Sequence, residues 1–100
     1  MTEHTDIHYT HNPEKNRYEI QDKTTLAGFA EYTLPDESHV DFVHTEVDEA
    51  YGGQGLAGGV VEFALADVRA QGKRIIAHCP YVVKWLAKHP EYQDITDPAN

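Results

Sequence analysis

The chain has 100 residues, enough for one domain with a modest core, and 40% of them are hydrophobic. Its formal net charge of −9 argues against general nucleic-acid binding, because a basic surface supplies most of that affinity. No apolar run reaches the roughly 18 residues of a membrane span, and the N-terminus lacks the basic and apolar regions of a signal peptide. A single cysteine rules out an intramolecular disulfide, so we expect a soluble cytoplasmic protein without nucleic-acid or membrane partners.

The first sixteen residues are polar, and we expect them to be only partly ordered apart from a short strand near Ile7 and Tyr9. His4, His8 and His11 recur there at a spacing that would gather them on a helix, where they could bind a metal ion. Because this segment is terminal and polar, we expect a polar tail and no metal site.

Three stretches of the chain alternate in hydrophobicity with the period of a β-strand. Residues 17–21 and 26–34 are joined by a short polar turn and predict an antiparallel hairpin, and residues 39–47 predict a third strand. In this third strand the apolar residues change face between Phe42 and Val43. A β-bulge would produce this one-residue slip, and a strand buried on both faces would also explain it.

The second half of the chain predicts a strand–helix–strand unit. An apolar stripe has helical spacing: Val61, Ala64, Leu65 and Val68. Gly72 suits a left-handed cap after this helix, residues 73–79 predict a short strand, and residues 81–89 predict a second helix. The last ten residues are expected to trail off. Two strands joined by a helix are parallel, so we predict a single α+β domain over residues 1–100 in which antiparallel strands lead into one βαβ crossover.

The stretch EAYGGQGLAGG, residues 49–59, places five glycines directly before the predicted helix. A helix start leaves backbone N–H groups unpaired and carries partial positive charge, and glycines let a ligand approach that backbone. We therefore predict a phosphate-binding loop rather than a flexible linker. A Walker A loop is excluded, because no lysine followed by serine or threonine closes the stretch. A dinucleotide-binding fingerprint is excluded because the next strand carries no acid for the ribose.

The segment GGQGLA resembles the pyrophosphate-binding loop of the GNAT N-acetyltransferases, whose pattern is Gln/Arg-x-x-Gly-x-Gly/Ala. Gly55 and Ala57 match its last two fixed positions, whereas Gly52 stands where the family usually has glutamine or arginine. With HTEV at 44–47 and HCPYV at 78–82, the chain resembles the minimal YjdJ-like branch of this fold over about residues 17–92. The resemblance implies a bulged central strand, acetyl-CoA as cosubstrate, and transfer of the acetyl group to a small-molecule or peptide amine.

The same resemblance implies where acetyl-CoA binds. Thr45 and Val47 are expected to offer backbone groups to the pantetheine amides. The pyrophosphate is expected on the loop residues Gly53, Gln54, Gly55, Leu56, Ala57 and Gly58. Residues 68–90 contain five basic residues and no acid, which places the 3′-phosphate there, with candidates Arg74, Lys84 and Lys88. Residues 36–49 contain six acids and no lysine or arginine, so a cationic acceptor is expected beside Glu46, Asp48 and Glu49.

Cys79 and His44 are the candidate catalytic residues. Cys79 ends the strand after the helix, where its thiol could accept the acetyl group, donate a proton to the departing CoA sulfur, or simply be buried. His44 precedes the loop and is a candidate general base, although it could also be a hydrogen-bonded histidine between strands. His78 or His44 could lower the pKa of the Cys79 thiol. Tyr81 is expected to be a core or rim aromatic residue rather than a proton donor.

Two other functions are consistent with the same residues. A CoA-binding or regulatory module with a degenerate site is favoured by the small size of the chain and by Gly52. A cysteine hydrolase would use Cys79 and His44, but the sequence offers no third catalytic member and no nucleophile-elbow motif.

Overall fold

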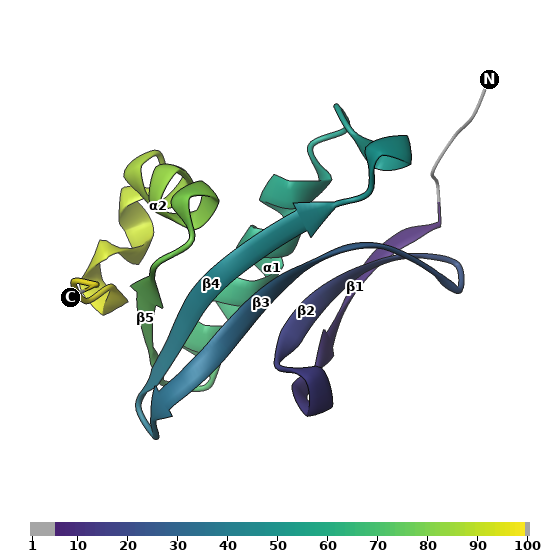
Figure 1. Ribbon diagram of the computed structural model, residues 1–100. Helices are drawn as coiled ribbons and strands as arrows, with labels where there is room; N and C mark the ends of the chain where they lie inside the picture. The colour runs from purple at the N-terminus through teal and green to yellow at the C-terminus, as the bar shows by residue number, and fades with distance from the viewer. Residues whose placement is uncertain (1–5, 100) are drawn as a thin grey trace.

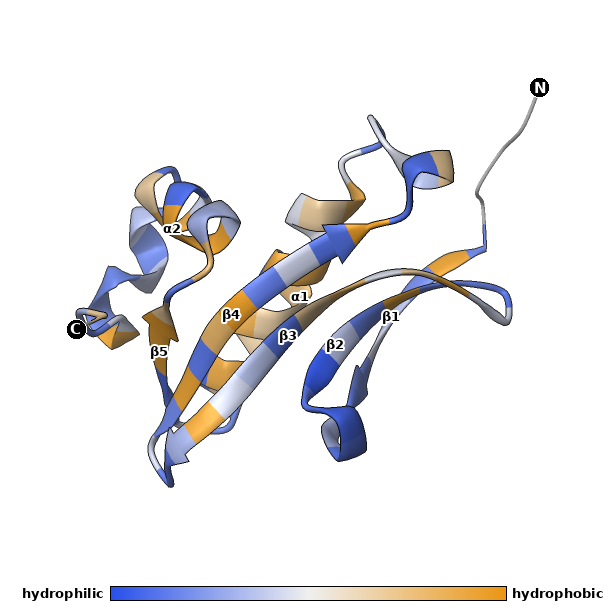
Figure 2. Cartoon of the chain, in the orientation of Figure 1, coloured by the Kyte–Doolittle hydropathy of each residue, from blue (hydrophilic) through white to orange (hydrophobic). Residues whose placement is uncertain are grey.

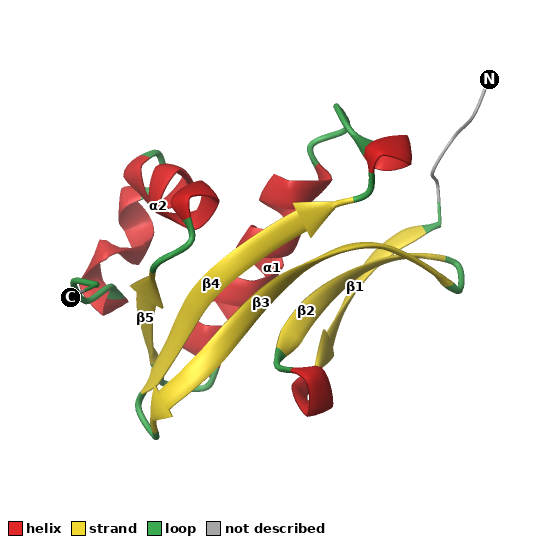
Figure 3. Ribbon diagram, in the orientation of Figure 1, coloured by secondary structure: helices red, strands yellow, loops and turns green. Residues whose placement is uncertain are grey.

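The computed structural model describes residues 6–99 and contains one mixed five-stranded sheet in the order β1-β2-β3-β4-β5 (Figure 1). The first three strand pairs are antiparallel, and β4 and β5 are parallel. The strands are β1 Ile7–Asn12, β2 Arg17–Asp22, β3 Thr25–Asp36, β4 His39–Val47 and β5 Arg74–Ala77. The expected α+β fold, with an antiparallel meander that feeds one parallel crossover, is therefore confirmed (Figure 3).

Two α-helices and three 3-10 turns complete the described chain. Helix α1, Leu56–Ala70, connects β4 to β5, and helix α2, Pro80–Ala87, follows β5. The 3-10 turns are η1 Pro13–Lys15, η2 Glu49–Tyr51 and η3 Pro90–Ile95. The predicted stripe of α1 is buried throughout, and Gly72 adopts the predicted left-handed conformation with φ of +72°. Within residues 6–99, neither helix has the length and apolar character needed to cross a membrane.

One hydrophobic core lies between α1 and one face of the sheet, which we call the inner face. The fully buried side chains of this core include Tyr18 of β2, Phe42 of β4 and Leu65 of α1. Hydrophobic residues gather on α1, α2 and the strands between them, whereas η1 is hydrophilic (Figure 2). The opposite, outer face of β2, β3 and β4 lies open toward the viewer in Figure 1, with α1 behind it.

The predicted β-bulge is present in β4. Glu31 pairs with His44 and Tyr32 pairs with Phe42, so Val43 is an extra residue with no partner in β3. A bulge inserts one residue and shifts the phase of every side chain after it. Phe42 and Thr45 consequently both face inward, and His44 faces outward.

The parallel pairing of β4 with β5 ends at the bulge. The last pair in register is Phe42 with Ala77, and the Phe42 carbonyl accepts hydrogen bonds from the backbone N–H groups of His78 and Cys79, both at 2.9 Å. Beyond this point the two strands diverge (Figure 1). Among the described residues, the backbone of residues 43–47 therefore pairs only with β3 and has an open edge toward β5.

The N-terminal segment is more ordered than expected, because β1 pairs with β2 along its whole length. His4 lies outside the described residues, and His8 and His11 lie in a strand, so the helical spacing does not bring them together. His11 instead stacks on Tyr18 at 4.1 Å between ring centroids and contacts the Tyr32 hydroxyl at 2.6 Å. These contacts place β1 in the structure rather than in a polar tail.

The C-terminal segment also differs from the expectation that it trails off. After η3, Thr96 pairs with Ile75 of β5 in a parallel bridge. Asp97 accepts hydrogen bonds from Arg74 at 2.7 and 2.9 Å, and the His39 ring lies 2.7 Å from the same carboxylate. Arg74 first, and then His39, hold the pKa of Asp97 at about 2. The tail therefore covers the free edge of β5 and joins the starts of both parallel strands.

Candidate active site

The glycine-rich loop turns the chain from β4 into α1 through two left-handed residues. Gly53 has φ of +77° and Gly55, the N-cap of α1, has φ of +74°. A side chain in this conformation is strained even though a Cβ at either position would meet nothing within 4 Å. Gly52, by contrast, is extended with φ of −66°, which any residue adopts. The turn thus depends on glycine at two positions and leaves open space beside them.

The first turn of α1 follows directly from this loop. Its first backbone N–H groups have no intrahelical partner, because an α-helix begins its hydrogen bonds four residues in. The buried side chain of Leu56 anchors the helix start in the core. The structure thus brings the predicted loop residues 53–58 together beside the end of β4, with residues 53–55 exposed and residues 56–58 in the first turn of α1. N–H groups at a helix start favour anions in general.

Cys79 lies across the strand divergence from Thr45. Its Sγ atom is 3.4 Å from the Thr45 hydroxyl oxygen, and the residue is 3% exposed. Cys79 is also the N-cap residue of α2. Thr45 and Val47 are half-buried and face inward on the open edge of β4. Thr45, one of the two predicted pantetheine residues, and the predicted thiol therefore meet on the inner side of the divergence.

His44 does not meet Cys79, which corrects the expectation that the two act together. The His44 side chain faces outward, 53% exposed, with Nε2 3.1 Å from a Glu46 carboxylate oxygen. Its ring also lies 5.9 Å from Phe29 of β3. Because Cys79 contacts the inward-facing Thr45, the two side chains are on opposite faces of β4. A cysteine hydrolase would need His44 to contact Cys79, and within residues 6–99 the two side chains make no such contact.

The outer face instead carries a histidine–carboxylate pair that the sequence reasoning missed. His78 Nδ1 lies 2.9 and 2.8 Å from the two carboxylate oxygens of Asp41. Asp41 was not singled out from the sequence, and His78 was considered only for its effect on Cys79. The parallel register pairs Asp41 with Ile76, two residues before His78. If the two predicted parallel strands had been aligned in this register, the alignment would have placed Asp41 near His78.

The predicted acids lie near the end of β4 and in η2, and all three are exposed. Glu46 contacts His44, and Asp48 accepts a hydrogen bond from the Ala50 N–H at 2.9 Å, which caps η2. Glu49 begins η2. Glu46 and Glu49 remain candidates for attracting a cation, while Asp48 also has a structural role.

Lys84 and Lys88 lie on the side of α2 that faces the start of α1. With Tyr81 and Trp85 they line a pocket of about 160 Å³. The Tyr81 hydroxyl is 3.4 Å from the position that a Cβ on Gly58 would occupy, so this pocket adjoins the first turn of α1. Two of the three predicted basic residues are therefore close to the loop.

Arg74, the third basic candidate, lies away from the loop. It begins β5 in register with His39, at the opposite end of β4 from the loop, and its guanidinium is paired with Asp97. The strand predicted over residues 73–79 has Arg74 at its start and Cys79 at its end, and this was the signal that could have shown that Arg74 lies far from the site.

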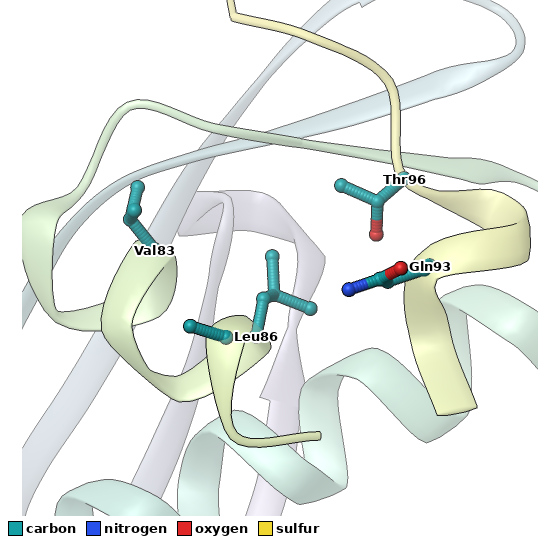
Figure 4. Close-up of a pocket in the computed structure, with 5 residues that line it drawn as sticks. Val83, Leu86, Gln93 and Thr96 are labelled. Carbon is teal, nitrogen blue, oxygen red and sulfur yellow. The ribbon is translucent and has the colours of Figure 1, made fainter. Parts of the chain in front are cut away.

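A larger pocket, about 350 Å³, lies between α2 and η3 (Figure 4). Its lining residues are Val83, Leu86, Ala87, Gln93 and Thr96. They come from the side of α2 opposite to Lys84 and Lys88 and include no titratable side chain. This pocket therefore lacks the groups that acid–base or nucleophilic chemistry needs.

A parallel β4–α1–β5 unit with a bulged β4 and a glycine turn at the start of α1 is the arrangement expected of an acetyltransferase of the GNAT class. Comparison with known proteins agrees with this class. The chain belongs to the GCN5-related N-acetyltransferase family, whose model matches residues 17–95. The match is to the family and does not distinguish the YjdJ-like branch within it. The search of curated proteins gave no match.

Two solved structures share the fold. The solution structure of a protein from Staphylococcus aureus described as GCN5-like has a TM-score of 0.72 and 23% identity, over 96% of this chain and 93% of that one. The crystal structure of Ard1 from Thermoplasma volcanium has a TM-score of 0.53 and 15% identity, over 60% of this chain and 40% of that one. At these identities the similarity supports the fold alone.

Proposed function

We propose that the protein transfers the acetyl group of acetyl-CoA to a cationic amine. The observation that carries the proposal is the left-handed glycine turn that leads into the start of α1 beside the open edge of β4. In this proposal the pyrophosphate binds the N–H groups of residues 53–58, where the glycines leave space and the helix start favours an anion.

The open edge of β4 supports the next part of the proposal. Amide groups bind well to an unpaired strand edge, because the backbone supplies donors and acceptors in a regular row. The pantetheine arm would run along residues 45–47 from the loop toward the strand divergence. This path brings the thioester to Thr45 and Cys79, whose side chains contact each other at 3.4 Å.

Cys79 would act on the thioester in one of two ways. Its thiolate can accept the acetyl group, which then passes to the amine, or its thiol can protonate the departing CoA sulfur. Its position at the start of α2 supports a chemical role, since the end of a helix that carries partial positive charge stabilises a thiolate. Its burial beside Thr45 is also what a purely structural cysteine would show.

The acceptor class follows from the acids near the end of β4. Glu46 and Glu49 would raise the local concentration of an ammonium group without taking part in the chemistry. We therefore expect release of free CoA from acetyl-CoA to be several-fold faster with spermidine or a lysine peptide than with glutamate as acceptor. Thiol release assays with matched acceptor concentrations measure this directly. Faster turnover of glutamate would contradict the cationic assignment.

The 3′-phosphate of CoA is proposed to lie beside Lys84 and Lys88. Replacing both with glutamine should weaken CoA binding about tenfold, the order expected for two charge-assisted contacts at an exposed site. Lys15→Gln, an exposed lysine on η1, serves as a matched control and should leave the affinity unchanged. Calorimetry with CoA and 3′-dephospho-CoA completes the comparison. Equal affinity of the wild-type protein for the two compounds would contradict this placement.

A CoA-binding module without transferase activity is the second candidate. The observation in its favour is Gly52, which supplies no side chain where the family usually has glutamine or arginine. This alternative predicts calorimetric binding of acetyl-CoA with no transfer to any amine. Binding together with acceptor-dependent CoA release would decide against it.

A further inference from the structure

His78 and Asp41 form a paired unit at the point where β4 and β5 diverge. The backbone N–H of His78 donates to Phe42, the last hydrogen-bonded position between the strands. The side chain turns to the outer face, because Ile75 and Ala77 of the same strand are buried on the inner face. Asp41 reaches the same place from β4, between the inward-facing Val40 and Phe42. The pair therefore lies at the outer mouth of the divergence, while Cys79 lies on its inner side.

The contacts of this pair fix which nitrogen of His78 carries hydrogen. An ionised carboxylate only accepts hydrogen bonds, so Nδ1, which contacts both Asp41 oxygens, carries a hydrogen. In the neutral ring Nε2 is then unprotonated. No hydrogen bond to Nε2 forms within residues 6–99, and the His78 side chain is 48% exposed, while that of Asp41 is only 12% exposed. A mostly buried carboxylate thus orients a ring whose basic nitrogen is accessible.

His44, the base expected from the sequence, is less well arranged for proton transfer. Its Nε2 is engaged by Glu46, and both side chains are more than half exposed, at 53% and 61%. Long, exposed partners hold a ring loosely, and water screens their charges. Asp41, in contrast, is held within the sheet. Of the two outward-facing histidines beside the divergence, His78 is therefore the better-positioned base.

We propose that His78 is the general base that deprotonates the acceptor amine and that Asp41 positions its ring. The inference rests on the acetyl-transfer function proposed above. The acceptor enters from the outer face as an ammonium and gives one proton to Nε2 of His78, which passes it to solvent. The amine lone pair forms the C–N bond, and the C–S bond breaks with its electron pair on the CoA sulfur. The second nitrogen proton ends on that sulfur, so the products are the amide, free CoA and one proton.

The test uses His78→Gln with two kinds of acceptor. One is an equimolar mixture of spermidine and a lysine peptide, which are protonated at neutral pH. The other is hydroxylamine, which is uncharged at neutral pH and needs no deprotonation before attack. With the mixture we expect kcat to fall about 100-fold, within the range for loss of a general base, and the KM for acetyl-CoA to change less than about twofold. With hydroxylamine the rate should fall less than about threefold.

Matched variants separate catalysis from folding. Asp41→Asn should lower kcat with the mixture by a smaller factor than His78→Gln, as expected of a positioning residue, and His8→Gln, an outward-facing histidine on β1, should change nothing. Free imidazole should restore part of the rate of His78→Ala with the mixture. Calorimetry with CoA and circular dichroism check that each variant is folded and binds the cofactor.

Several outcomes would overturn the assignment. Equal losses with both acceptors, or a larger loss in His44→Gln than in His78→Gln, would remove His78 as the base. If the wild-type protein acetylates hydroxylamine but neither spermidine nor the lysine peptide, His78 is not a general base for a protonated acceptor, because no such acceptor is used. A wild-type protein that binds CoA but acetylates neither acceptor would instead defeat the proposed function itself.

Discussion

Gly55→Val is expected to weaken CoA binding about 100-fold, which corresponds to about 2.7 kcal/mol. Gly55 has φ of +74°, a conformation that a β-branched residue adopts only with strain, and it is the N-cap of α1. A valine would either distort the turn or fill the space that the pyrophosphate is proposed to occupy. Both effects act on the same N–H groups of the first helical turn. Isothermal calorimetry with CoA measures the loss.

Gly52→Ala is the control for this experiment. Gly52 lies in the same loop with φ of −66°, and a Cβ there would meet only the Glu49 carbonyl oxygen, at 3.4 Å. Alanine should therefore be accommodated and should leave CoA affinity within about twofold of the wild type. Wild-type affinity in Gly55→Val, with the fold confirmed by circular dichroism, would rule out the loop as the pyrophosphate site.

Cys79→Ala is expected to lower turnover by about 100-fold if the thiol acts on the thioester, whether as acetyl acceptor or as proton donor. The physical reason is its contact with Thr45 at the inner side of the strand divergence, where the proposed pantetheine path ends. The rate of CoA release with spermidine measures this loss. Cys79→Ser replaces the thiol with a hydroxyl of similar size and serves as the matched variant for packing.

The mass of the protein separates the two chemical roles of Cys79. Mixing the wild-type protein with acetyl-CoA alone adds one acetyl group if the thiolate is a nucleophile, and Cys79→Ala should then gain no mass. An unchanged mass together with slow turnover of the alanine variant indicates a proton donor. Unchanged mass and unchanged turnover of Cys79→Ala would make the residue structural, with a cost of about 1 kcal/mol or less in stability.

The features that the sequence predicted best depend on local patterns. The phase slip at Phe42 and Val43 indicated the bulge, and the stripe over residues 61–68 indicated which side of α1 is buried. The features it missed depend on the register between strands that are distant in sequence. His78 meets Asp41, and Arg74 meets Asp97, only because β4 and β5 align as they do and the tail returns to them. Periodicity within one segment carries no information about such pairings.

The tail that joins Arg74 and His39 through Asp97 has a mechanical consequence for the two parallel strands. The beginnings of β4 and β5 are held together through Asp97, and their ends diverge. The contacts that hold the register of the two strands therefore lie at the end opposite to the divergence. Asp97 has a lowered pKa and His39 a raised one, so these contacts are complete between about pH 4 and the ordinary histidine pKa of about 6.5. The Arg74–Asp97 contact is lost as the pH falls through about 2, and the charged His39 contact is lost as the pH rises through the raised pKa of His39.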